Sequence, residues 1–188
     1  MLVAPSSYDG LTLPEDWLCA TCGHPRCEHT CLQFERATAE FVGMLRIRNE
    51  SRWIAEVIEA ALALCSHLYI LDDHSTDNTR DVCARYERAT VFPSPFDGFN
   101  ESRDKNWLLD QLIARCAPEW IVCLDGDEVL APESVKAMRA ATRDCDCPAY
   151  SLQIIFLWND RQTMRTDWVY GEFWRPSLFR AFHVHPDT

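Results

Sequence analysis

The sequence predicts an α/β fold in which helices cover both faces of a mostly parallel central sheet, preceded by an irregular, Cys-rich N-terminal leader. Two observations lead to this prediction. Short apolar segments typical of strands alternate four times with segments that carry apolar residues at helical spacing. The central strand segments are continuously apolar, which is typical of strands buried on both faces of a parallel sheet.

The predicted elements follow one another from residue 41 to residue 158. Residues 1–40 hold a cysteine cluster, three prolines and little periodicity, so they predict a leader that ends near Glu40 and precedes one domain, 41–188. The segments with strand character are 41–47, 67–71, 90–93, 120–124 and 149–158. The segments with helix character are 51–65, with Ser51 placed to cap its start, 79–87, 102–116 and 132–143, which begins with a proline.

Composition excludes several classes of protein. The formal net charge of −11 argues against a nucleic-acid partner, because phosphate neutralisation needs clustered Lys and Arg. No apolar run approaches the roughly 20 residues that a membrane helix requires, and the N-terminus lacks the basic start and apolar core of a signal peptide. The sequence therefore predicts a cytoplasmic protein with no membrane span.

Four cysteines lie within thirteen residues of the leader: Cys19, Cys22, Cys27 and Cys31. Zinc takes four N or S ligands, and a C-x-x-C pair presents two thiolates from one tight turn, so the cluster is a candidate structural zinc site. The second pair is not C-x-x-C, and free thiols or a redox pair remain the alternatives.

Acidic residues follow two of the buried strands. The carboxyl ends of parallel strands meet at one edge of a sheet, where ligands bind. Asp125 and Asp127 flank Gly126, which is expected to let the backbone turn sharply so that both carboxylates point to one place. Their oxygens suit magnesium or manganese, and such an ion could hold the diphosphate of a nucleotide. The alternative is that Asp125 only ends the strand and that Glu128 is solvated.

The segments "LYILDDHSTDNTRDV" (68–82) and "WIVCLDGDEVL" (120–130) resemble family 2 glycosyltransferases, which have the GT-A fold. The first strand, "MLRIRNES" (44–51), and the helix start, "FNESRDKNWLL" (99–109), are similar to the corresponding family segments. The resemblance implies a GT-A-like three-layer sandwich and an inverting transfer of a sugar from a nucleotide donor to an acceptor hydroxyl. It also implies UDP as the expected nucleotide and Mn or Mg as the cofactor.

The resemblance also implies roles for single residues. The residues that match donor-binding positions are Arg48, Asn49, Asp73, Arg103, Lys105, Asn106 and Asp125. Among them Asp73 matches the acid that holds the base. Asp127 matches the acid that binds the metal, whereas Asp125 contacts the ribose or the metal. For Arg103 and Lys105 the alternative is a solvated helix face.

The segment "WVYGEFWRPSLFR" (168–180) resembles the acceptor side of the family, with a strand that ends in "LFR". The catalytic base of the family is a carboxylate further on, and a histidine often completes its metal site. The candidates here are Asp167, Glu172, His183 and His185, none of which lies in a recognisable motif. The acceptor side is short in comparison with the family, and a non-catalytic nucleotide-sugar-binding or scaffold protein is the alternative. A nucleotidyltransferase would share the sheet and the acidic metal site, but "RIRNES" lacks the glycine-rich loop of that class.

Overall fold

The computed structural model describes residues 37–143, 147–160, 162–167, 170 and 173–181. The predicted zinc ligands Cys19, Cys22, Cys27 and Cys31 therefore lie outside the described residues. The same holds for Glu172, His183 and His185, three of the four candidates for the acceptor side.

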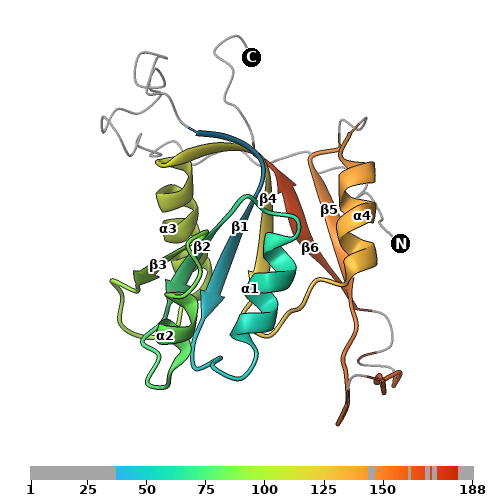
Figure 1. The fold of residues 1–188 in the computed structure, drawn as a ribbon, viewed down its shortest axis with the longest axis horizontal. Helices are drawn as coiled ribbons and strands as arrows, with labels where there is room; N and C mark the ends of the chain where they lie inside the picture. Colours follow the sequence, from blue (N-terminus) through green and yellow to red (C-terminus); the bar gives the residue numbers. More distant parts are fainter. Residues whose placement is uncertain (1–36, 144–146, 161, 168–169, 171–172, 182–188) are drawn as a thin grey trace.

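Six strands form one mixed sheet in the order β3-β2-β1-β4-β6-β5 (Figure 1). The strands are β1 (Ala37–Ile47), β2 (His67–Asp72), β3 (Ala89–Pro93), β4 (Cys116–Asp125), β5 (Ala149–Ile154) and β6 (Phe173–Arg180). The first four are parallel to one another, and β6 runs antiparallel to both β4 and β5. The predicted, mostly parallel sheet is confirmed.

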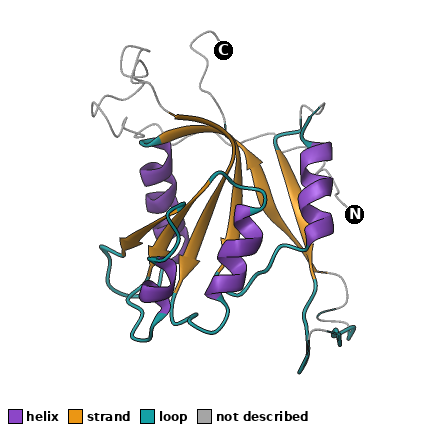
Figure 2. Cartoon of the chain, viewed as in Figure 1, coloured by secondary structure: helices purple, strands orange, loops and turns teal. Residues whose placement is uncertain are grey.

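Helices cover both faces of this sheet and give the predicted three layers (Figure 2). The helices are α1 (Ile54–Leu62), α2 (Thr79–Cys83), α3 (Glu101–Ile113) and α4 (Pro132–Ala141). One core contains side chains of α1, α2 and α4, and the other contains Leu108 and Leu112 of α3. None of the helices in the described part of the chain has the length and apolarity needed to span a bilayer.

The strand predicted from residues 120–124 is central, because β4 lies between β1 and β6. Trp120 and Val122 are fully buried in the core under α1 and α4, whereas Ile121 packs in the core under α3. Each such side chain contributes about 1.5–3 kcal/mol through removal of apolar surface from water. Coverage of both faces explains why the segment is continuously apolar.

Several predicted boundaries are wrong. β4 begins at Cys116 instead of residue 120, β5 ends at Ile154 instead of residue 158, and α2 ends at Cys83 instead of residue 87. The strand β1 begins at Ala37, four residues before the predicted start, because its first residues pair with the start of β4. The helix α1 begins at Ile54, and Ser51 does not cap it. The backbone N–H of Ser51 instead donates to Asp77 Oδ2 at 3.2 Å, which ties this loop to the loop after β2.

Candidate functional site

The carboxyl ends of β1, β2 and β4 meet at one edge of the sheet, as the strand directions predict. Arg46 of β1 is in register with Leu71 of β2 on one side and with Asp125 of β4 on the other. Asp73 follows directly after β2, and its backbone N–H donates to the last carbonyl of β1 at 2.9 Å. Asp73 and Asp125 therefore lie on either side of the end of β1.

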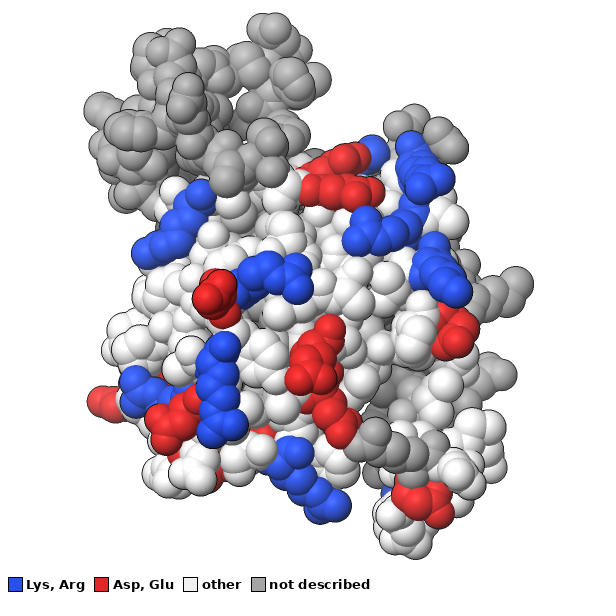
Figure 3. Space-filling view, in the orientation of Figure 1, with Lys and Arg blue, Asp and Glu red and all other residues white. Residues whose placement is uncertain are grey.

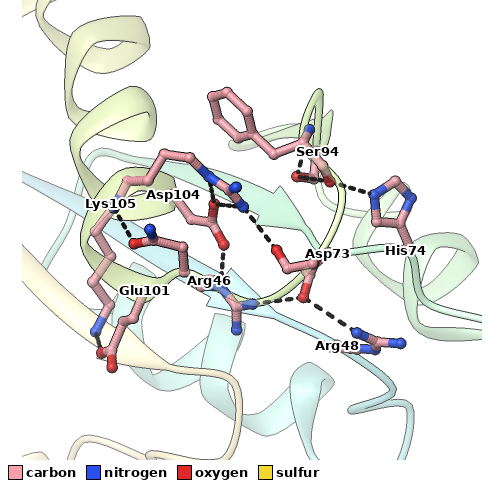
Figure 4. Close-up of polar contacts among 12 residues, drawn as sticks. Arg46, Arg48, Asp73, His74, Ser94, Glu101, Asp104 and Lys105 are labelled. Carbon is pink, nitrogen blue, oxygen red and sulfur yellow. Dashed lines mark hydrogen bonds and ion pairs between the residues drawn. The ribbon is translucent and has the colours of Figure 1, made fainter.

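Asp73 is buried, with its side chain 2% exposed, and two arginines contact it (Figure 4). Arg46 Nη2 lies 2.5 Å and Arg48 Nη1 lies 3.5 Å from Asp73 Oδ2. A buried carboxylate needs such partners, because an unpaired charge out of water is costly. Arg46 and Arg48 therefore neutralise this acid and fix its orientation.

Arg46 also reaches a second buried acid, Asp104, in the first turn of α3. Its Nε donates to Asp104 Oδ2 at 3.0 Å, and Arg103 Nε donates to Asp104 Oδ1 at 2.9 Å. Burial opposes the ionisation of Asp104, but the hydrogen bonds from Arg103 and Arg46 outweigh it and hold its pKa below the ordinary value. The exposed ring of Phe99 lies over Arg46, 4.6 Å from its guanidinium carbon.

Sequence reasoning missed Arg46 and Asp104. The available signal was an arginine inside the otherwise apolar strand segment "FVGMLRI", since a charge in a buried strand has to meet a buried counter-charge. The ion pair between them also places the start of α3 at this edge.

Asn49 lies at the predicted edge, but its side-chain oxygen is already engaged. Asn49 has a left-handed backbone with φ of 56°, and its Oδ1 accepts from the backbone N–H of Thr76 at 2.8 Å. Its own N–H donates to Ser75 Oγ at 2.9 Å. In this structure Asn49 joins the loops that follow β1 and β2.

The turn after β4 contains three carboxylates, and two of them are paired with cations. Asp125 Oδ1 lies 3.2 Å from Lys105 Nζ, and Asp125 Oδ2 lies 2.5 Å from Arg175 Nη1. Arg175 Nη2 pairs with Glu128, whose Oε2 also accepts from the backbone N–H of Asp125 at 3.0 Å. Burial opposes the ionisation of Asp125, but Arg175 and Lys105 outweigh it, so the pKa of Asp125 lies below its ordinary value.

Asp127 differs from its two neighbours. It is exposed and has no hydrogen-bond or ion-pair partner among the residues that the structure describes. The pKa of nearby Glu50 is raised, first by burial and then by the charges of Asp127, Asp77 and Asp125. Asp127 is thus a carboxylate surrounded by other acids, with no cation paired to it.

The expectation for Gly126 needs correction. Its backbone is not left-handed, so the turn does not require glycine for its φ angle. A Cβ atom at this position would instead lie 2.6 Å from Glu50 Cγ and 3.1 Å from Ile47 Cγ2. Gly126 is needed for space, because it lets the end of β1 pack directly against the acidic turn.

The residues present fit a divalent ion that is shared with a phosphate ligand. In the described ranges no group of three or more His, Cys, Asp or Glu side chains could form a metal site by itself. Magnesium is usually held by one or two carboxylates together with substrate phosphates. Asp127 offers such an oxygen ligand, whereas both oxygens of Asp125 are occupied by cations.

The other predicted residues lie at the start of α3 and beyond β5. Asn100 caps α3 by accepting from the N–H of Arg103 at 3.0 Å, and Asn106 is exposed. Asp167 is exposed and pairs with Arg165 at 2.6 Å, and the guanidinium of Arg165 lies over the ring of Tyr170. Asp167 has no direct contact with the acids at the sheet edge among its hydrogen bonds and ion pairs.

Both acidic and basic side chains lie on the face seen in Figure 3, with several Lys and Arg side chains close together at the upper right and a group of acidic side chains near the centre.

The sequence profile of glycosyl transferase family 2 matches residues 46–183. Two curated relatives are each 26% identical over 128 residues: "Uncharacterized protein Rv3786c" of Mycobacterium tuberculosis (strain H37Rv) and "Uncharacterized protein Mb3815c" of Mycobacterium bovis. The match covers 63% of this chain and 31% of each relative, so the chain spans about a third of the length of these relatives.

Two solved structures match parts of this chain. Glucosyl-3-phosphoglycerate synthase from Mycobacterium tuberculosis, solved with uridine-diphosphate, matches with a TM-score of 0.39 and 22% identity, over 48% of this chain and 35% of that one. A 4-diphosphocytidyl-2C-methyl-D-erythritol synthase matches with a TM-score of 0.50 and 9% identity, over 76% of this chain and 75% of that one. The second match supports the fold alone.

Proposed function

The chain belongs to glycosyl transferase family 2, and we propose that the carboxyl edge of its sheet binds a nucleotide sugar for transfer to an acceptor hydroxyl. UDP is the proposed nucleotide, and Mn or Mg is the proposed ion. The observation that carries the proposal is that two acids in different environments lie at the same edge of the sheet. Asp73 is buried and held by arginines, whereas Asp127 is exposed and has no cation paired to it in the described structure.

These two environments suit two different ligand groups. Both arginines contact Oδ2 of Asp73, so Oδ1 is the oxygen that would accept an N–H from the base. Asp127 would bind the divalent ion, which when bound supplies positive charge to the diphosphate. Lys105 and Arg103 lie at the start of α3, where a helix N-terminus also favours an anion.

The proposed reaction is a direct displacement with inversion. The acceptor oxygen forms a bond to the anomeric carbon while the bond from that carbon to the diphosphate oxygen breaks. The acceptor proton passes to a base, for which Asp167, Glu172 and His185 remain candidates. The nucleoside diphosphate leaves, and Lys105 would stabilise the charge that develops on it.

The second candidate is a protein that binds a nucleotide sugar without turning it over. One observation favours it: Asp167, the base candidate within the described ranges, is already paired with Arg165. Incubation with UDP-sugars and manganese, followed by measurement of released UDP, separates the two. Release of UDP by the wild type that is lost in Asp127→Asn supports the transferase. Binding of the UDP-sugar without release of UDP supports the second candidate, and the absence of binding contradicts both.

A thermal-shift panel of nucleotide sugars, with and without manganese, tests the donor. A ligand stabilises the native state only if the native state binds it. We expect UDP-sugars with manganese to raise the melting temperature more than the corresponding guanosine or adenosine compounds. Equal shifts for all bases would contradict the role of Asp73.

A further inference from the structure

We propose that Arg175 is a positioning residue that keeps the metal affinity of the turn at residues 125–128 low until a diphosphate binds. The inference rests on the metal site of the proposed function, but it concerns a residue of β6 that lies outside the segments compared with the family's donor site. It starts from the charges that surround the turn.

Arg175 forms ion pairs with two carboxylates at once. Its side chain is 25% exposed, its Nη1 lies 2.5 Å from Asp125 Oδ2, and its Nη2 pairs with Glu128. A guanidinium is always charged and presents its donors in a rigid fork, so one arginine can hold two acids in a fixed relation. Lys105 takes the other oxygen of Asp125 at 3.2 Å.

The three carboxylates of the turn at residues 125–128 are therefore not all available to bind a metal ion. Three carboxylates face two cations, and the pairing leaves Asp127 as the acid without a positive partner in the described structure. A divalent ion at Asp127 is repelled by Arg175 and Lys105, and it could use Asp125 only by displacing one of them. An incoming diphosphate brings negative charge of its own and supplies the remaining oxygen ligands.

The fold brings Arg175 to this place. β6 runs antiparallel to β4, with Leu178 in register with Val122. The chain of β6 therefore passes beside the end of β4 three residues before Leu178, and Arg175 reaches the turn from there. Because metal and diphosphate each favour the other's binding, removal of Arg175 should weaken their coupling by strengthening the binding of the metal alone.

Calorimetric titration of manganese chloride into the nucleotide-free chain tests this. We expect Arg175→Gln to bind Mn²⁺ at least about threefold more tightly than the wild type, because a positive charge near the ion is removed and Asp125 becomes available. Arg175→Lys keeps the charge but loses the fork that holds two acids, so its Mn²⁺ affinity should lie between those of the wild type and Arg175→Gln. The matched control is Arg180→Gln. Arg180 lies on the same strand and pairs with Glu119 at 3.8 Å, and its replacement should leave the Mn²⁺ affinity unchanged.

The sign of the change separates the proposal from a purely structural role. If Arg175 only held the turn in shape, its loss would loosen the ligands and weaken Mn²⁺ binding. Equal or weaker binding by Arg175→Gln, or no binding by either chain, overturns the proposal. Circular dichroism checks that the variant folds, and Arg175→Met replaces it under the same expectation if it does not.

A parallel titration with UDP keeps the proposal distinct from the proposed function. If Arg175→Gln strengthens Mn²⁺ binding but UDP does not bind to the wild type, the role of Arg175 stands and the nucleotide site is wrong. If UDP binds with manganese but Arg175→Gln leaves the Mn²⁺ affinity unchanged, the nucleotide site stands and the role of Arg175 is wrong.

Discussion

Replacement of Asp104 with asparagine should destabilise the chain although the residue lies at the edge of the sheet. Asp104 is fully buried, and its two oxygens accept hydrogen bonds from Arg46 at 3.0 Å and from Arg103 at 2.9 Å. Asparagine keeps the size but removes the charge, so two guanidinium groups lose their shared counter-ion. The consequence is local repulsion between Arg46 and Arg103 at the start of α3.

The magnitude follows from what each arginine retains. Removal of one partner of a buried ion pair costs about 3–5 kcal/mol. Arg46 keeps Asp73 at 2.5 Å, and Arg103, 33% exposed, keeps the carbonyl of Gly98 at 2.8 Å. We therefore expect a loss at or just below the lower end of this range, about 2–3 kcal/mol, which corresponds to a decrease of about 5–10 °C in the melting temperature.

Urea unfolding followed by circular dichroism measures this loss. The matched control is Asp110→Asn on the same helix, where an exposed aspartate has no ion pair in the described structure, and it should change the free energy of unfolding by less than about 0.5 kcal/mol. Because the pKa of Asp104 is lowered, its contribution is complete above its ordinary pKa of 3.8 and decreases as the pH falls below that value. A loss at neutral pH no larger than that of the control would refute this account of the edge.

Three further substitutions test the site. Asp127→Asn should abolish the effect of manganese on UDP affinity in calorimetry. Its melting temperature should stay within about 2 °C of the wild type, because the exposed side chain supports no contact in the described structure. An unchanged manganese effect would show that another acid binds the ion. Asp73→Ala should weaken UDP and UDP-sugars alike by at least about tenfold, because it removes the oxygen that accepts from the base, and it should leave the affinity for Mn²⁺ alone within about twofold. A variant that loses Mn²⁺ and keeps UDP would reverse the two assignments. Glu50→Gln should raise the melting temperature at pH 7–8, because the raised pKa of Glu50 means that its ionised carboxylate destabilises the fold there. The gain should vanish below the ordinary pKa of 4.5, and a gain that persists at pH 4 would exclude this electrostatic cause.

The sheet and the edge could be predicted because they depend on local patterns. The continuous apolar segment 120–124 requires cover on both faces, which makes β4 central, and the direction of parallel strands then brings Asp73 and Asp127 to one edge. Helix spacing likewise predicted α3 to within a few residues of its observed bounds, Glu101–Ile113.

The partners of the acids could not be predicted, because they come from distant parts of the chain. Arg46 and Asp104 are 58 residues apart, and Arg175 and Asp125 are 50 residues apart. The second pair exists only because β6 enters the sheet between β4 and β5, an order that no local periodicity encodes. Gly126 shows a related difficulty, since its need for space depends on the packing of Glu50 against it.

The central claim is that this edge binds a nucleotide diphosphate through a divalent ion, and the affinity of the wild-type chain for UDP tests it most directly. Calorimetry would compare UDP in saturating manganese with UDP in EDTA, and uridine, which lacks the diphosphate, would be titrated under both conditions. We expect manganese to tighten UDP binding at least about tenfold and to leave the weaker binding of uridine unchanged, because Asp127 would hold the ion and the ion would supply positive charge to the diphosphate. UDP binding that is absent, or equally strong in manganese and in EDTA, would contradict the claim.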